Sequence, residues 1–159
     1  MREFKIGPIA DVVITDLKKN SDERGWLAEL FRQDEMEEGI YPVMSYISLT
    51  YPKKSRGPHE HKEQTDYFCF LGIGTFRLYL WDNRPHSPTY QNKLVLTFGE
   101  GELKRVIVPP GVVHGYVNIG DSPAYIINFP NRLYKGWGRK EAVDEIRYEN
   151  QPSPFQFDL

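Results

Sequence analysis

The sequence predicts an all-β fold, an antiparallel sandwich or barrel of short strands, and three observations favour it. Aromatic residues make up 14% of the chain, and 13 glycines and 12 prolines are spread along it, which is typical of short strands with tight connections. Apolar segments of strand length recur with turn signals between them. The helices that a parallel α/β fold needs between its strands are absent from the pattern.

The clearest strand signal is Thr75–Trp81, where Phe76, Leu78 and Leu80 would lie on one face and the odd-numbered positions on the other. The apolar segment Asp66–Leu71 precedes it, and Gly72-Ile73-Gly74 predicts a tight hairpin between the two. The other strand candidates, in chain order, are Asp11–Leu17, Trp26–Phe31, Met44–Thr50, Lys93–Phe98, Arg105–Val108, His114–Ile119 and Ala124–Phe129. One short C-terminal helix is predicted over Arg139–Ile146.

Length and composition restrict the class of protein. A chain of 159 residues fits one domain, 1–159, with one core. The net charge is −2 and no basic stripe is present, so nothing favours nucleic-acid binding. The single cysteine, Cys69, excludes an internal disulfide, and the N-terminus lacks the apolar core of a signal peptide. No apolar run is long enough to span a bilayer. These features predict a cytoplasmic protein.

Three of the four histidines lie in two informative segments. In His59-Glu60-His61 the two imidazoles would project to the same side of a strand, and Asp66 follows shortly afterwards. The second segment contains Pro109, Gly111, His114 and Asn118. The fourth histidine, His86, lies in a predicted loop and is expected to face solvent.

These two segments resemble the two motifs of the cupin superfamily. The first motif is HxH followed by an acid, with Asp66 where glutamate is usual, and the second is PxGxxHxxxN, matched at every position. The resemblance implies a cupin jelly-roll (double-stranded β-helix) barrel. It also implies a small-molecule site around His59, His61, Asp66 and His114, a ligand set that suits Fe, Mn, Ni or Zn as a divalent ion. The alternative is that these side chains are hydrogen-bonded groups with no metal.

A second set of segments extends over most of the chain: Asp22-Glu23-Arg24-Gly25 with Glu29 and Phe31, Arg56-Gly57-Pro58-His59, Ser87-Pro88-Thr89, Pro110-Gly111-Val112-Val113-His114-Gly115 and Leu133-Tyr134. In this order they resemble the dTDP-4-dehydrorhamnose 3,5-epimerase (RmlC-like) branch of cupins. It implies proton abstraction next to a sugar ketone, with His59 as the base. Arg24 and Arg56 fall on diphosphate- and substrate-binding positions, and Glu29 on another pocket position. No cofactor is required for this chemistry.

The chain departs from that family at several positions. Met44 and Tyr46 stand where the family has glutamine and asparagine, which makes Tyr46 a candidate substrate contact. Asp66 stands where the family has a lysine after the base. His61 restores a metal-ligand pair that the epimerases lack.

The acid and the residue that orients the base are also changed. Aligning the family's acid tyrosine places it on Phe129, which cannot donate a proton; Tyr134, Tyr116 and Tyr67 are the candidate replacements. The orienting aspartate falls near Glu149, which could substitute for it.

Three functions therefore remain open. The first is a nucleotide-sugar isomerase acting on a 4-keto-6-deoxy sugar through His59. The second is a metal-dependent small-molecule cupin, a dioxygenase or an isomerase. The third is a non-catalytic sugar-binding cupin. The RmlC-like resemblance also implies a homodimer, in which Arg24 would reach the partner's pocket.

Overall fold

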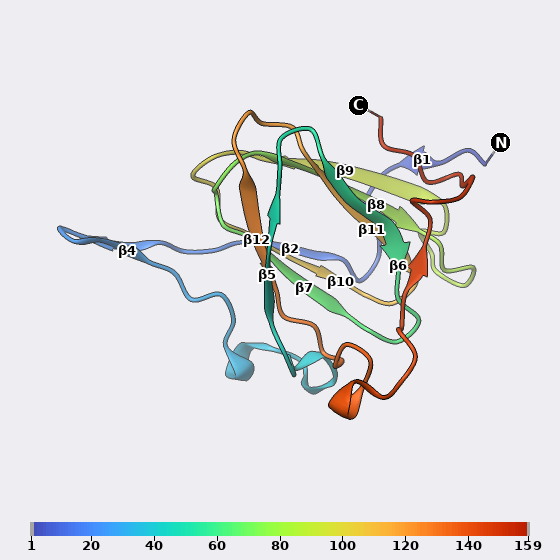
Figure 1. Ribbon diagram of the computed structural model, residues 1–159, viewed down its shortest axis with the longest axis horizontal. Coiled ribbons are helices and arrows are strands. Elements are labelled where there is room, and N and C mark those ends of the chain that lie inside the picture. Colours follow the sequence, from blue (N-terminus) through green and yellow to red (C-terminus); the bar gives the residue numbers. More distant parts are fainter. Residues whose placement is uncertain (1, 159) are drawn as a thin grey trace.

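Two β-sheets pack face to face in the computed structural model, which describes residues 2–158 (Figure 1). The six-stranded sheet has the order β1-β9-β8-β11-β6-β13, and the five-stranded sheet has the order β2-β10-β7-β12-β5. Neighbouring strands are antiparallel except for β1 and β9. This arrangement confirms the all-β jelly-roll prediction.

The strands are short, as the spacing of the turn signals predicts. They are β1 Lys5–Ile6, β2 Val13–Asp16, β3 Asn20–Asp22, β4 Gly25–Leu27, β5 Tyr46–Thr50, β6 Ser55–Glu60, β7 Asp66–Phe70, β8 Phe76–Asp82, β9 Asn92–Phe98, β10 Lys104–Val108, β11 Val112–Asn118, β12 Ala124–Asn128 and β13 Ile146–Arg147. Three single turns of 3₁₀-helix lie at Gln33–Glu35, Glu38–Ile40 and Trp137–Arg139. None of the helical turns in the described part of the chain has the length and apolarity needed to cross a bilayer.

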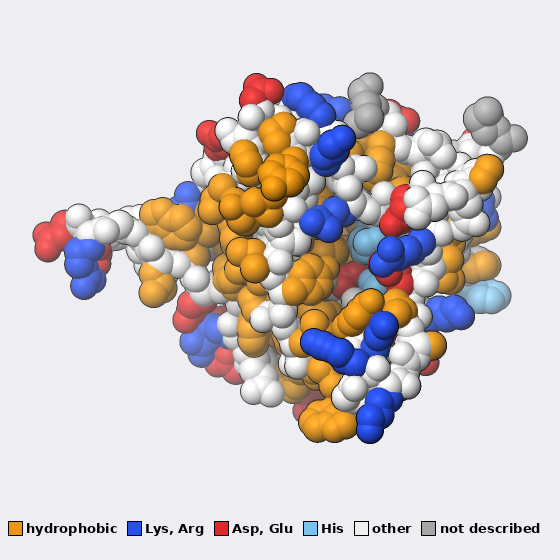
Figure 2. Space-filling model, in the orientation of Figure 1, with side chains coloured by type: hydrophobic (Ala, Val, Ile, Leu, Met, Phe, Trp, Pro, Cys, Tyr) orange, Lys and Arg blue, Asp and Glu red, His pale blue; other side chains and the backbone are white. Residues whose placement is uncertain are grey.

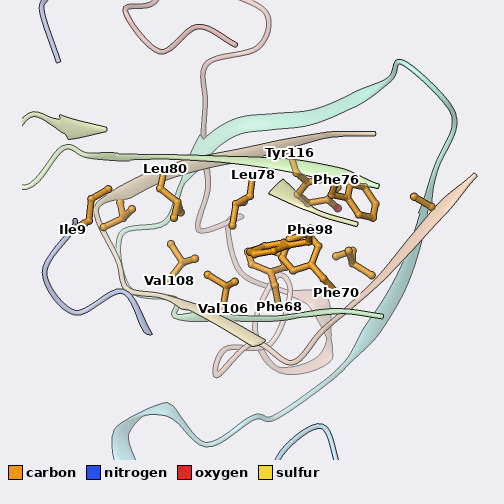
Figure 3. Close-up of a cluster of buried hydrophobic side chains, with 13 residues drawn as sticks. Ile9, Phe68, Phe70, Phe76, Leu78, Leu80, Phe98, Val106, Val108 and Tyr116 are labelled. Atoms are coloured by element: carbon orange, nitrogen blue, oxygen red, sulfur yellow. The ribbon is translucent and has the colours of Figure 1, made fainter. Parts of the chain in front are cut away.

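The core lies between the two sheets and depends on the alternation seen in the sequence. Leu78 and Leu80 of β8 point inward and meet Phe68 and Phe70 of β7, which come from the opposite sheet (Figure 3). The odd positions of β8 face the other way, where Trp81 packs against Phe155 from the C-terminal segment. Both faces of β8 are therefore buried, which explains why its two sides are both rich in large side chains.

The predicted hairpin between Asp66–Leu71 and Thr75–Trp81 is wrong. β7 pairs with β10 and β12, whereas β8 pairs with β9 and β11 in the other sheet. The glycine-containing segment 72–74 thus crosses from one sheet to the other. Alternation identifies strands, but it does not identify their hydrogen-bonding partners.

Two further predictions are corrected. The C-terminal helix over Arg139–Ile146 is not formed: the chain makes one 3₁₀ turn, Trp137–Arg139, and then pairs Ile146 and Arg147 with β6. Positive φ at Gly138 and Arg139 ends the helical turn there. The strand predicted over Trp26–Phe31 is shorter, because β4 ends at Leu27.

The hairpin of β3 and β4 projects away from the sandwich (Figure 1). Its second strand carries Trp26 and Leu27, which are 55% and 64% exposed. An isolated two-stranded hairpin is marginally stable in water. This element therefore has apolar surface that the single chain does not bury.

Candidate active site

Four predicted side chains converge at one end of the sandwich. His59 lies on β6, His61 follows the end of that strand, and Asp66 begins β7. His114 on β11 is the direct register partner of His59, so strand pairing brings the two motifs together. One donor atom from each of the four residues lies within 4.8 Å of the others. The sequence prediction that these residues meet is confirmed.

Backbone carbonyls orient two of the imidazoles. His114 Nδ1 lies 2.9 Å from the carbonyl oxygen of Val112, and His61 Nδ1 contacts the carbonyl oxygen of Asp144. A carbonyl oxygen only accepts, so each Nδ1 carries a proton and donates it. Each Nε2 points to Asp66 Oδ2, at 3.1 Å for His61 and 3.0 Å for His114.

The other carboxylate oxygen of Asp66 is fully engaged. Asp66 Oδ1 accepts hydrogen bonds of 2.8 Å from the side-chain amides of Gln64 and Asn128. Within the described residues, Asp66 Oδ2 and His114 Nε2 are buried without a hydrogen bond of acceptable geometry, although they lie 3.0 Å apart. Oδ2 is thus held at the centre of the cluster by contacts made through its partner oxygen.

Burial and neighbouring charges shift the pKa values of His59 and His61 in opposite directions. Burial, together with the nearby His114, lowers the pKa of His59 to about 2, so this imidazole is neutral at working pH. Burial also disfavours charge on His61, but the contact with Asp66 outweighs it and raises the pKa of His61 to about 9. For Asp66, the two imidazoles outweigh burial and hold its pKa well below its ordinary value.

His59 has a carboxylate neighbour that the sequence interpretation missed. Glu145 Oε1 lies 3.7 Å from His59 Nδ1, and both side chains are largely shielded from solvent. Arg147 of β13 donates from Nε to the other oxygen of Glu145 over 2.8 Å. Because Arg147 pairs with His59 in the strand register, β13 brings this ion pair to the histidine. Glu149, the predicted orienting residue, lines the same pocket but forms no ion pair with His59 among residues 2–158.

A pocket opens above the cluster, with His59 and His61 in its lining. One wall comes from the β5–β6 region, including Met44, Tyr46 and Arg56, and the opposite wall comes from the segment 130–149. In Figure 2, histidine side chains are visible in this hollow, with Lys and Arg side chains around it. Burial raises the pKa of Tyr46 above its ordinary value, and its hydroxyl accepts a hydrogen bond from Asn128.

Unpaired cations border the pocket. Arg56 donates to Thr50 Oγ1 and to the carbonyl oxygen of Leu49, and it makes no ion pair with any described carboxylate. Lys135 and Arg139 on the opposite wall also have no ion-pair partner among residues 2–158. Glu60, which lies between His59 and His61 in the sequence, faces the other side of the sheet and accepts hydrogen bonds from Asn83 and Tyr148.

Two predicted substrate-binding residues lie outside the pocket of their own chain. Arg24 is at the tip of the β3–β4 hairpin, where its side chain is 84% exposed and pairs with Asp22. Glu29 is also exposed and lies 3.4 Å from Arg32. The tertiary structure of one chain therefore does not bring Arg24 or Glu29 to His59.

The three tyrosine candidates for the acid differ in whether they line the pocket. Tyr134 and Tyr116 line the pocket, and Tyr134 is 51% exposed at its mouth. Tyr67 does not: its hydroxyl donates to the carbonyl oxygen of Leu30 on the outer side of the five-stranded sheet. Phe129 packs on that same outer side, with ring centroids 5.1 Å from Phe31 and 6.0 Å from Tyr67. Phe129, with which the family's acid tyrosine aligns, therefore does not line the pocket.

Comparison with known proteins identifies the family of the chain. Residues 7–141 match the family described as dTDP-4-dehydrorhamnose 3,5-epimerase. The chain is 42% identical over 128 residues to the probable low-salt glycan biosynthesis epimerase Agl13 of Haloferax volcanii, covering 79% of this chain and 81% of that protein. It is 35% identical over 126 residues to the spore coat polysaccharide biosynthesis protein SpsL of Bacillus subtilis, covering 79% and 82%.

A solved structure supports the fold independently. The dTDP sugar isomerase of Desulfovibrio desulfuricans superposes with a TM-score of 0.78 at 21% identity, covering 93% of this chain and 91% of that one. The family match extends over most of the chain and includes both histidine segments. The chain belongs to the dTDP-4-dehydrorhamnose 3,5-epimerase family.

Proposed function

We propose that this protein epimerises a 4-keto-6-deoxy sugar attached to a nucleoside diphosphate, with His59 as the general base. The observation that carries the proposal is the imidazole of His59 in the lining of a pocket, with a carboxylate 3.7 Å from its Nδ1. A neutral imidazole can accept a proton from the carbon next to a ketone. Glu145 is placed to stabilise the imidazolium that results, and Arg147 holds Glu145 in position.

Inversion of the carbon requires a second group. Once His59 has taken the proton, the electron pair moves into the enolate, and a proton must return to the same carbon from the opposite face. Tyr134 is our candidate for this acid, because its side chain lies in the pocket wall opposite the β5–β6 region and is accessible at the mouth. All of these steps use side chains only and need no cofactor.

Solvent-hydrogen exchange tests the proposal directly. We expect the protein, incubated in D₂O with dTDP-4-keto-6-deoxyglucose, to incorporate deuterium next to the ketone, detected by NMR or mass spectrometry. Every turnover of a proton-transfer epimerase carries solvent hydrogen into the sugar. Absence of exchange, with dTDP binding retained, would instead favour a sugar-binding protein.

Arg56 is proposed to hold the diphosphate together with the cations of the opposite wall. Each charge-assisted hydrogen bond contributes about 1.5–3 kcal/mol, so Arg56→Ala should weaken dTDP binding by roughly tenfold to a hundredfold. The measurement is calorimetric titration with dTDP. Lys53→Ala is the matched control, because Lys53 is an exposed cation that pairs with Asp121. Equal affinity in the Arg56 and Lys53 variants would contradict the assignment.

We also propose a homodimer that covers the β3–β4 hairpin. Trp26 and Leu27 are exposed on it, and Ile47 is exposed on the outer face of the five-stranded sheet. Burying such surface against a second copy would offset the marginal stability of the hairpin, and it could carry Arg24 to the partner's pocket. Light scattering should give the mass of a dimer, and Trp26→Glu should shift it towards the monomer. A monomeric wild type at micromolar concentration would contradict this proposal.

A further inference from the structure

We infer that the hydroxyl of Tyr46 donates a hydrogen bond to the ketone oxygen of the sugar and stabilises the enolate that forms when His59 removes the proton. The inference rests on the proposed function and assigns a catalytic residue that the steps above do not use. Three features support it: the chemistry at the ketone oxygen, the fixed position of the Tyr46 hydroxyl and the absence of another acceptor for its proton within residues 2–158.

Proton abstraction next to a ketone places negative charge on the ketone oxygen. The C–H bond breaks, its electron pair forms a double bond to the ketone carbon, and the π pair of the carbonyl moves to the oxygen. A donor that already points at this oxygen stabilises the charge most effectively, because it does not reorganise during the reaction. His59 takes the proton from carbon, so a second side chain has to donate to the oxygen.

Strand register places Tyr46 next to the cluster that contains the base. Tyr46 of β5 is the direct partner of Asn128 of β12, and the two strands lie side by side (Figure 1). Asn128 Nδ2 lies 3.1 Å from the Tyr46 hydroxyl oxygen and 2.8 Å from Asp66 Oδ1. Asp66 and His59 belong to the group whose donor atoms lie within 4.8 Å of one another. One amide group therefore connects the Tyr46 hydroxyl to the histidine cluster.

The amide of Asn128 holds the Tyr46 hydroxyl in place through its oxygen. Asn128 Oδ1 accepts a hydrogen bond of 2.9 Å from the backbone N–H of Tyr67, so its NH₂ group faces the opposite way. The two hydrogens of that group go to the Tyr46 hydroxyl oxygen and to Asp66 Oδ1. Asn128 is fully buried, so these contacts fix the position of the phenol oxygen at the base of the pocket.

The proton of the Tyr46 hydroxyl is available to a bound sugar. An amide NH₂ group only donates, so the Tyr46 oxygen accepts from Asn128 and its own proton is not used in that contact. No residue among 2–158 accepts a hydrogen bond from this hydroxyl. Burial, followed by the negative charge of Asp66, raises the pKa of Tyr46, so the proton stays on the oxygen. Tyr46 also lines the pocket.

Other donors in this wall have different contacts. Ser48 points to the same side of β5 as Tyr46, since side chains alternate along a strand. Its Oγ lies 3.2 Å from the hydroxyl of Tyr116, and these two hydroxyls hydrogen-bond to each other. Arg56 donates to two acceptors of β5 and is the residue proposed to bind the diphosphate. Tyr46 is therefore the donor assigned to the ketone.

Tyr46→Phe tests the inference, because it removes the hydroxyl and keeps the ring. We expect this variant to incorporate deuterium into dTDP-4-keto-6-deoxyglucose about 10²- to 10³-fold more slowly than the wild type, the usual cost of losing one such donor. Affinity for dTDP, measured by calorimetry, should stay the same, since dTDP lacks the keto sugar. Tyr51→Phe is the matched control and should exchange at the wild-type rate, because Tyr51 is 65% exposed and does not line the pocket.

The configuration of the deuterated sugar separates this role from that of the acid. Loss of an acid that returns the proton to carbon leaves exchange with the original configuration. Loss of the enolate donor slows proton removal itself, so deuterium should enter slowly in both configurations. Circular dichroism checks that Tyr46→Phe is folded, and a matching loss of dTDP affinity would indicate a structural role and overturn the inference.

A second measurement does not depend on the activity of a Tyr46 variant. His59→Asn should bind the keto sugar without consuming it, so the ¹³C resonance of its labelled ketone carbon can be recorded in the complex. A hydrogen bond to the carbonyl oxygen moves this resonance downfield from its position in the free sugar. We expect that shift in His59→Asn and its loss in the double variant with Tyr46→Phe.

The possible failures are distinguishable. The inference is overturned if folded Tyr46→Phe exchanges at the wild-type rate, if the ketone resonance does not move in His59→Asn, or if the double variant keeps the shift. Each of these results leaves the proposed function and its base standing. Absence of exchange in the wild type would instead refute the proposed function, and the role of Tyr46 with it.

Discussion

His59→Asn should slow deuterium incorporation into the 4-keto sugar by about 10²- to 10⁴-fold, the contribution expected of a positioned general base. The asparagine amide fills similar space and can hydrogen-bond, but it cannot accept the proton. Affinity for dTDP should change little, because Arg56, and not His59, is the residue proposed to bind the diphosphate, and the base acts only in the transition state. Exchange is measured by NMR under single-turnover conditions, and affinity by calorimetry.

A matched pair of carboxylates sharpens this test. Glu145 and Glu149 both line the pocket, but only Glu145 lies within 4.0 Å of His59. Glu145→Gln should lower the exchange rate by roughly tenfold, because the imidazolium loses its counter-charge, and Glu149→Gln should not. Normal exchange in His59→Asn would exclude His59 as the base. A larger loss in Glu149→Gln than in Glu145→Gln would restore the assignment made from sequence.

Tyr134→Phe should separate proton removal from inversion. If Tyr134 returns the proton, its loss should reduce formation of the epimer by about 10²- to 10⁴-fold. His59 is untouched in this variant, so deuterium should still enter the sugar with the original configuration. The two outcomes are distinguished by NMR of the same reaction, since retained and inverted products give different couplings.

Tyr116→Phe is the control for that experiment. Tyr116 also lines the pocket, but it is buried and its hydroxyl lies 3.2 Å from Ser48 Oγ. We expect this variant to invert the sugar at close to the wild-type rate. If inversion is lost in Tyr116→Phe and kept in Tyr134→Phe, Tyr116 is the acid. If both variants invert normally, neither tyrosine has this role.

Local sequence patterns predicted the all-β fold because each short strand of a jelly roll has a period-2 alternation of side chains and is bounded by turn residues. The alternation over Thr75–Trp81 predicted one strand with two different faces, and the structure shows that both faces are buried. The same periodicity predicted that His59 and His61 share a side. Two short motifs then predicted that His114 and Asp66 join them, and the register between β6 and β11 does so.

Local sequence patterns do not predict which strands pair with each other. The sequence of segment 72–74 predicts a hairpin because glycines favour tight turns. The strands on either side nevertheless belong to different sheets. Which strand lies beside β7 depends on contacts with β10 and β12, which are distant in the chain. The same limit affected Arg24 and Glu29, whose distance from His59 follows from the projecting hairpin.

The sequence by itself determined the all-β class, the four-residue cluster and the family resemblance, because each depends on residue type and short spacing. Only the tertiary structure decided that Glu145 and not Glu149 lies beside His59, and that Phe129 faces out of the pocket. The physical reason is that β13 pairs with β6 through long-range backbone hydrogen bonds. In Glu145-Ile146-Arg147 the i, i+2 spacing of opposite charges is a strand signal, but the same residues also fit a helix, and only pairing with β6 selects the strand.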